Sequence, residues 1–157
     1  MRKLILLFSL LFLNNIAFSK DSLDEKSKEE VLNVLEVNEA LHASFFKYNA
    51  KDVQANAEKT AAAIAKVSNK EVKKLLENAS KKLSEIKEGA DRESNNKNYH
   101  QASMAMIYVI NKYDLGDKYS GYRCPMVKKK WVQNSQKMGR VHNPYAPEMP
   151  HCGGRMK

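Results

Sequence analysis

The clearest helical pattern in the chain is SNKEVKKLLENASKKLSEIKEG, residues 68–89. Its apolar side chains recur every three or four residues, a spacing that places them on one face of an α-helix. They are Val72, Leu75, Leu76, Ala79, Leu83 and Ile86. Ser68 and Glu71 have the spacing of a capping box, and Gly89 is a typical residue beyond a helix end. The stretch predicts an amphipathic helix that needs partners to cover its apolar face.

Three further segments with the same kind of pattern lie on either side of this helix. The first has apolar residues at Val31, Val34, Leu41, Phe45 and Tyr48, interrupted by Asn38. The second has Val53, Ala57, Ala61, Ile64 and Val67, with Asp52 as the expected N-cap, and the last has Tyr99, Ala102, Met106, Val109, Ile110 and Tyr113. Residues 22–113 contain no proline and only one glycine. We therefore predict an all-α fold, an up-and-down bundle of about four helices.

Residues 115–157 have a different composition. They contain all four prolines, five of the six glycines, both cysteines and the only tryptophan, with no sustained helical or strand period. Such a segment is too short to build a core of its own. We expect an irregular C-terminal segment that packs on the bundle through Trp131 and its tyrosines, so that residues 20–157 form a single helical-bundle domain.

The N-terminus has the pattern of an export signal. Arg2 and Lys3 precede ten mainly apolar residues, 4–13, and the small residues Ala17 and Ser19 suit cleavage by signal peptidase. Ten apolar residues are too few to span a bilayer, which needs about 20. We predict that residues 1–19 are a signal peptide and that the mature chain begins at Lys20, is periplasmic or secreted, and is not stably inserted in a membrane.

The formal net charge of +9 is compatible with anionic lipid or acidic partners, or simply with a well-solvated surface. Export argues against nucleic acid as a partner.

No phosphate-binding loop, nucleophile elbow or zinc-protease helix is present, so we do not expect an enzyme. His42 and His100 lie beside apolar positions of predicted helices, which is typical of partly buried histidines with one hydrogen-bond partner. The sequence does not specify an oligomeric state.

Soft sulfur atoms occur at both ends of the C-terminal segment. Cys124 and Met126 flank Pro125, and Met149 lies three residues before Cys152. Outside the cytoplasm two cysteines ordinarily form a disulfide, which here would enclose about 27 residues and stabilise the fold by about 3 to 4 kcal/mol. A metal ion shared by the two ends would close the same loop, and thiolate with thioether ligands favours Cu(I) or Ag(I). Zinc bound by Cys124, Cys152, His142 and His151 would match none of the usual zinc spacings.

The C-terminal motifs also carry a resemblance. Tyr122-x-Cys124-Pro125-Met126, Trp131, Asn143-Pro144-Tyr145 and Met149-x-x-Cys152-Gly153 resemble the signature of a periplasmic family of unassigned function. That domain occurs alone and also fused to membrane-fusion subunits of copper and silver efflux systems, and its helical part resembles residues 31–113. One departure is Ala146-Pro147, where many members have an aromatic residue and glycine.

The resemblance implies a soft-metal role for Cys124, Met126, Met149 and Cys152, with efflux or metal-handling proteins as possible partners. His151 is added to this set because it is next to Cys152. The sequence thus predicts an exported protein that binds Cu(I) in metal handling or resistance. The alternative is a non-enzymatic structural or interaction module in which the two cysteines form a disulfide.

Overall fold

The computed structural model describes residues 19–156, so the predicted signal peptide, apart from Ser19, lies outside the described residues. Within residues 19–156, no helix combines the length and the apolar content needed to cross a membrane. The helices are α1 (Glu25–Phe46), α2 (Ala50–Ala65), α3 (Lys70–Ser84) and α4 (Arg92–Lys112), and the strands are β1 (Tyr119–Cys124), β2 (Lys129–Asn134) and β3 (Gly154–Arg155).

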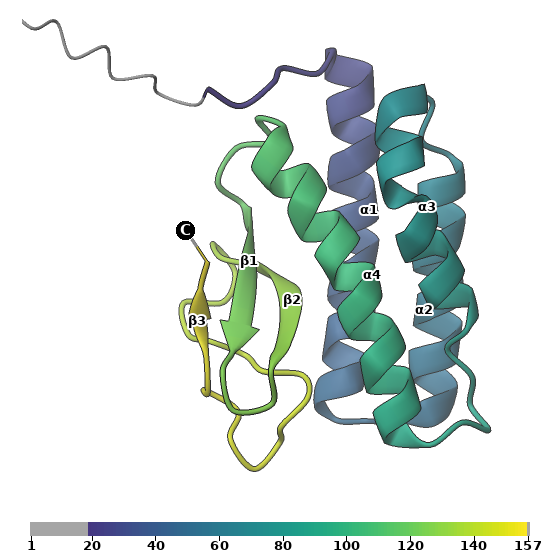
Figure 1. Ribbon diagram of the computed structural model, residues 1–157, viewed down its shortest axis with the longest axis vertical. Helices are drawn as coiled ribbons and strands as arrows, with labels where there is room; N and C mark the ends of the chain where they lie inside the picture. Colours follow the sequence, from purple (N-terminus) through teal and green to yellow (C-terminus); the bar gives the residue numbers. More distant parts are fainter. Residues whose placement is uncertain (1–18, 157) are drawn as a thin grey trace, which may run out of the picture.

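The four helices run up and down beside one another, as predicted (Figure 1). Each begins at an Asp or Asn whose side chain accepts a backbone N–H of the first turn: Asp24, Asn49, Asn69 and Asp91. The predicted caps at positions 52 and 68 are therefore wrong, because Asn49 and Asn69 start α2 and α3. An Asn or Asp side chain at this position satisfies backbone donors that have no partner within the helix.

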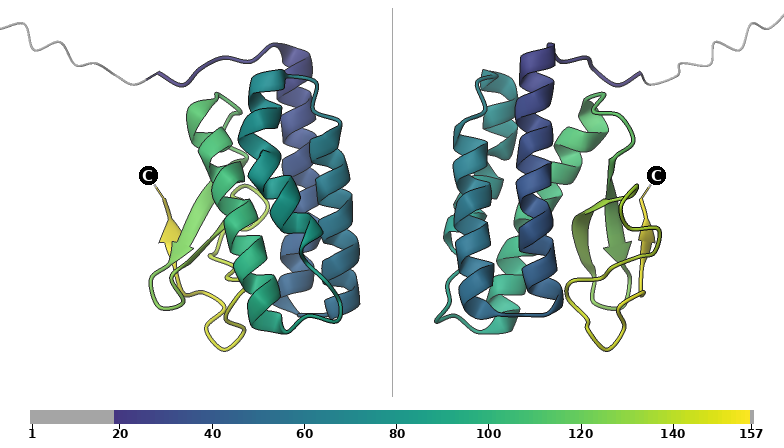
Figure 2. Two further views of the ribbon diagram at one scale, coloured as in Figure 1. Left: turned by 45° about the vertical axis from the view of Figure 1, so that its right-hand side comes forward. Right: turned by 180° about the vertical axis from the view of Figure 1, so that it is seen from behind.

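The predicted all-α fold is wrong, because the C-terminal segment contains a three-stranded antiparallel sheet in the order β2-β1-β3. The fold is therefore α+β. β1 and β2 form a hairpin in which Tyr122 lies opposite Trp131 and Cys124 opposite Lys129. The hairpin lies against α4 and α1, and β3 forms the edge of the sheet farthest from the helices (Figures 1 and 2).

Strand β1 and the second half of β2 have no alternating pattern in the sequence because both of their faces are covered. On one face Gly121 approaches α4 so closely that an added Cβ would lie 3.0 Å from Ile107 Cγ2. On the other face Gln133 accepts the backbone N–H of His142 and donates to the carbonyl of Arg140. Five of the six residues of β1 are buried. A strand buried on both faces lacks the apolar-polar alternation by which strands are recognised.

A column of aromatic rings joins the C-terminal segment to the bundle. Phe45 of α1 stacks on Tyr99 of α4 with ring centroids 4.5 Å apart. Tyr145 contacts Tyr99 at 5.8 Å and Trp131 at 6.1 Å, and Trp131 stacks on Tyr122 at 5.9 Å. Trp131 is fully buried. The prediction that Trp131 and the tyrosines anchor this segment is confirmed.

Candidate functional site

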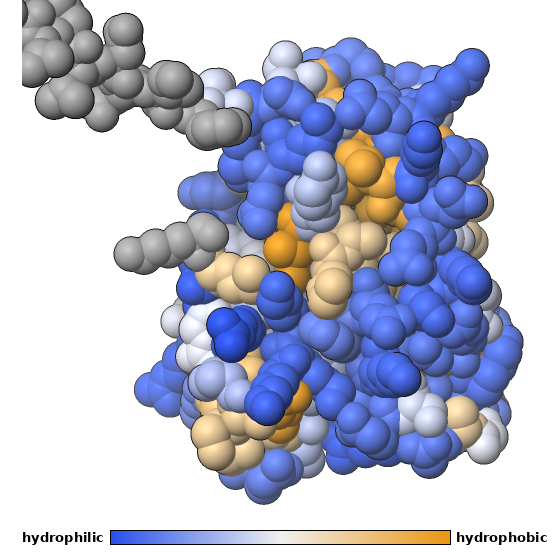
Figure 3. All heavy atoms as spheres, viewed as in Figure 1, coloured by the Kyte–Doolittle hydropathy of each residue, from blue (hydrophilic) through white to orange (hydrophobic). Residues whose placement is uncertain are grey.

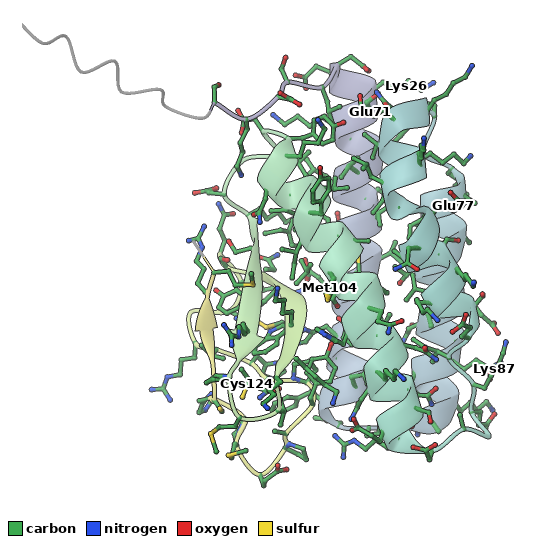
Figure 4. The ribbon with its side chains drawn as sticks, viewed as in Figure 1. Lys26, Glu71, Glu77, Lys87, Met104 and Cys124 are labelled. Atoms are coloured by element: carbon green, nitrogen blue, oxygen red, sulfur yellow. The ribbon has the colours of Figure 1, made fainter. Side chains whose placement is uncertain are left out.

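The fold brings Cys124 and Cys152 together. Cys124 is the last residue of β1 and is buried, whereas Cys152 is half-buried and lies just before β3 (Figure 4 labels Cys124). Both are free thiols, and their Sγ atoms are 2.7 Å apart. The antiparallel pairing of β1 with β3 causes this approach, because it places Arg123 opposite Gly154.

The Asn-Pro-Tyr motif holds the loop that carries Cys152. The side chain of Asn143 donates to the carbonyl of Cys152 at 3.2 Å, and its backbone N–H donates to the carbonyl of Pro150 at 2.8 Å. The same side chain accepts the N–H of Tyr145 at 3.0 Å. Tyr145 then donates its hydroxyl to the carbonyl of Lys130 in β2 at 2.9 Å. Asn143 and Tyr145 thus fix the position of Cys152 relative to the sheet.

The surroundings of the two thiols favour a thiolate on Cys124. Burial raises the pKa of Cys124, but hydrogen bonds from the Cys152 thiol, the backbone N–H groups of Val127 and Met126, and the side chain of Asn143 outweigh it, so that the pKa is lowered. The pKa of Cys152 is raised, first by its hydrogen bond to Cys124 and then by burial. Of the two thiols, Cys124 is therefore the more easily deprotonated, and the thiolate is the form that acts as nucleophile and metal ligand.

The two predicted methionine ligands differ in position. Met126 lies in the turn between β1 and β2, and 69% of its surface is exposed. Met149 is half-buried, and its carbonyl accepts the N–H of Cys152 at 2.9 Å. Each methionine thus lies in the same chain segment as one of the cysteines, and the side chain of Met126 is exposed to solvent.

The histidines do not complete the site. His151 is exposed, and its Nδ1 atom lies 2.8 Å from the carbonyl of Val141. Among residues 19–156, no three His, Cys, Asp or Glu side chains gather closely enough to hold a metal ion. The structure therefore does not place His151 in a cluster with both thiols, and the zinc alternative with His142 is not assembled.

One histidine contact was missed by the reasoning from sequence. His42 of α1 and His142 of the C-terminal segment approach to 2.9 Å between Nε2 and Nδ1, and the ring of Phe46 stacks on His142 with centroids 3.6 Å apart. His42 is buried. Nothing in the spacing of residues 100 positions apart indicates such a contact. The apolar neighbours of His42 predicted a partly buried side chain with one hydrogen-bond partner, whereas the ring is fully buried.

No protein-family model, curated protein or solved structure matches the chain. The interpretation of the site therefore depends on its chemistry.

Proposed function

We propose that the chain is an exported protein that binds a soft metal ion, Cu(I), through the thiols of Cys124 and Cys152. The observation that carries this proposal is the approach of these two sulfur atoms to 2.7 Å from opposite ends of the C-terminal segment. Thiolate sulfur favours Cu(I) over hard cations such as Mg²⁺ or Ca²⁺. The lowered pKa of Cys124 supports the proposal, because the thiolate is the form that binds metal.

Met126 is the best-placed candidate for a third sulfur ligand. It follows Cys124 by two residues, and its exposed side chain is free to turn toward a metal ion. Met149 is the second candidate, through its contact with the backbone of Cys152. Two sulfur atoms bound to one metal at about 2.3 Å each are roughly 3.8 to 4.6 Å apart, so binding requires Cys152 to move outward by about 1 to 2 Å.

The test is a titration of the fully reduced protein with Cu(I) against a competing chelator, without oxygen. Cys124→Ser and Cys152→Ser are expected to weaken binding by about a hundredfold or more, which is at least the effect of losing an outer-shell partner. Met126→Leu is expected to weaken it less, and His151→Gln to leave it unchanged. Met138→Leu is the matched control, a methionine in the same segment but outside the site. Binding that persists in both serine variants would contradict the proposal.

A second function is favoured by the same short distance. Two free thiols 2.7 Å apart are well placed to form a disulfide, which would make the protein a structural or interaction module with a locked C-terminal segment. Thiols outside the cytoplasm remain available for a metal only if they are kept reduced or protected by it. Counting free thiols in the protein as isolated separates the two functions. Absence of thiols, with no Cu(I) binding after reduction, would favour the disulfide.

Export is part of the proposal and has its own test. The basic start, the apolar run and the small residues near Ser19 support cleavage before Lys20. Mass spectrometry of protein produced with its full N-terminus is expected to show a chain beginning at Lys20 outside the cytoplasm. An intact Met1 in the cytoplasmic fraction would contradict export and leave the metal chemistry to be judged separately.

A further inference from the structure

A second surface feature, which does not involve the thiols, is an apolar strip on α4 formed by Met104 and Tyr108. Met104 and Tyr108 are one helical turn apart on the same face and expose 45% and 56% of their surfaces. Figure 3 shows apolar surface gathered in the middle of this side of the molecule and bordered by hydrophilic residues, and Figure 4 labels Met104 within it. Exposed apolar surface of this kind, bordered by polar residues, is typical of a binding surface.

The strip forms one wall of a groove between α4 and the sheet. Its larger hollow has a volume of about 520 Å³ and extends from Asn111 to Tyr119 and Gly121 of β1. A smaller hollow of about 200 Å³ continues it along Met104 and Tyr108, and Met156 borders both. At the bottom of the groove, β1 lies close to α4 because Gly121 has no side chain to separate it from Ile107. We call this surface the α4–β1 groove.

The charges that line the α4–β1 groove are positive. Lys20 and Arg155 line its larger hollow, Lys130 lines the smaller hollow, and no carboxylate lines either. In residues 19–156 none of these three cations lies within 4.0 Å of a carboxylate, although other lysines form such ion pairs. The groove therefore favours an anionic occupant.

The backbone of β1 adds a third feature. On the side of β1 that faces β3, Tyr122 and Arg123 pair with β3, and the carbonyl of Gly121 accepts one more hydrogen bond from the backbone N–H of Met156. Within the described residues, Tyr119 at the start of β1 has no strand partner on that side. An extended segment can bind such an edge through main-chain hydrogen bonds while its alternate side chains enter neighbouring hollows.

We propose that the α4–β1 groove binds an extended acidic peptide segment of a partner protein. Its carboxylates contact Lys20, Lys130 and Arg155, and its apolar side chains pack on Met104 and Tyr108. Methionine adapts its shape to varied apolar side chains, which suits such a surface. A second copy of this chain is a poor occupant, because the chain is strongly basic, with a net charge of +9 over the full sequence, and two copies repel each other. The concave shape fits a peptide better than it fits a flat membrane.

The probe is a fluorescein-labelled decapeptide of alternating Glu and Leu, and binding to the purified protein is followed by fluorescence anisotropy. Saturable binding is expected, and Arg155→Glu and Lys130→Glu are each expected to weaken it by about tenfold. Tyr108→Ser is also expected to weaken it. Lys74→Glu is the matched control, an exposed lysine on α3 away from the groove, and is expected to bind like the parent protein. Because the substituted positions are on the surface or at its margin, circular dichroism should show an unchanged fold.

Three results would overturn the proposal. They are the absence of saturable binding, equal binding of a decapeptide with Lys in place of Glu, and equal weakening by Lys74→Glu. Amide shifts on adding the acidic peptide are expected to cluster in residues 104–111 and 119–121, and a cluster elsewhere would also overturn it. A vesicle experiment gives a further test. If the protein sediments with vesicles of phosphatidylglycerol and phosphatidylcholine, if Arg155→Glu abolishes this sedimentation and if the peptide does not inhibit it, the groove is a membrane-binding surface and the proposal is overturned.

Discussion

His42 is held neutral inside the fold. Burial, together with charge repulsion from the neighbouring His142, lowers its pKa from 6.5 to about 3, while Glu39 acts in the opposite direction. His142 also has a lowered pKa, through burial and the nearby His151. In the unfolded chain both rings take up a proton near pH 6.5. The folded state therefore loses stability as the pH falls from about 6.5 toward 3.

This lowered pKa predicts acid sensitivity that depends on His42. Between pH 7.5 and 5.0 the His42 contribution alone is expected to reduce the free energy of unfolding by about 2 kcal/mol. In His42→Leu this contribution disappears, so urea midpoints at the two pH values should lie closer together than in the parent protein. An equal loss of stability in both proteins would show that other groups cause the acid sensitivity.

Gly153, which follows Cys152, has a backbone conformation that favours glycine. Its φ is +130°, and an added Cβ would lie 2.7 Å from the carbonyl oxygen of Arg123 and 2.9 Å from Trp131 Cη2. Both are rigid neighbours, so Gly153→Ala is expected to lower the free energy of unfolding by about 2 kcal/mol or more. The adjacent Gly154→Ala meets nothing within 4 Å and is the control. Urea unfolding measures both, and similar losses would contradict this account.

The junction between α1 and the hairpin depends on Glu39. One carboxylate oxygen accepts the Tyr119 hydroxyl at 2.6 Å and the Asn134 amide at 2.8 Å, and the other pairs with Lys137 at 3.0 Å. The side chain of Glu39 is only 16% exposed. These hydrogen bonds more than offset the cost of burial and lower the pKa of Glu39. A single carboxylate thus joins α1 to β1, β2 and the turn that follows.

Glu39→Gln is expected to lower the free energy of unfolding by about 1 to 3 kcal/mol, because a charge-assisted hydrogen-bond acceptor is replaced by an amide that also presents donors. Glu36 offers a matched control on the same helix. Its side chain is 68% exposed and lies 4.0 Å from Lys118, so Glu36→Gln should change stability by less than about 0.5 kcal/mol. Thermal or urea unfolding distinguishes them, and equal effects would show that the junction does not depend on Glu39.

The helices were predictable from sequence to a greater extent than the sheet. Val72, Leu76, Ala79 and Leu83 are buried, as their spacing indicated, because the helical period is a local property of the chain. The strands were missed because Tyr119, Ser120, Gly121 and Tyr122 are buried in succession. A run of buried residues gives the same sequence pattern whether it lies in a strand, a turn or a packed loop.

The molecule as a whole has one core, since the aromatic column continues from Phe45 and Tyr99 of the bundle to Trp131 of the sheet. We therefore expect the bundle and the C-terminal segment to unfold together. Fluorescence of Trp131 reports on the sheet, and circular dichroism reports mainly on the helices. The two urea curves should coincide in midpoint and slope. Loss of the tryptophan signal before the helical signal would show that the segment unfolds independently.

Much of the candidate site also followed from chemistry that is local to the sequence. Two cysteines with methionines nearby in the sequence indicate soft-metal or disulfide chemistry whatever their positions in the fold. Side-chain spacing alone likewise indicated the four amphipathic helices. The 2.7 Å approach of Cys124 to Cys152, the His42–His142 contact and the three bonds to Glu39 did not follow, because they join residues 28 to 100 positions apart. Contacts at such separations depend on strand pairing and on what covers each face of the sheet, and these arise only when the whole chain packs around one core.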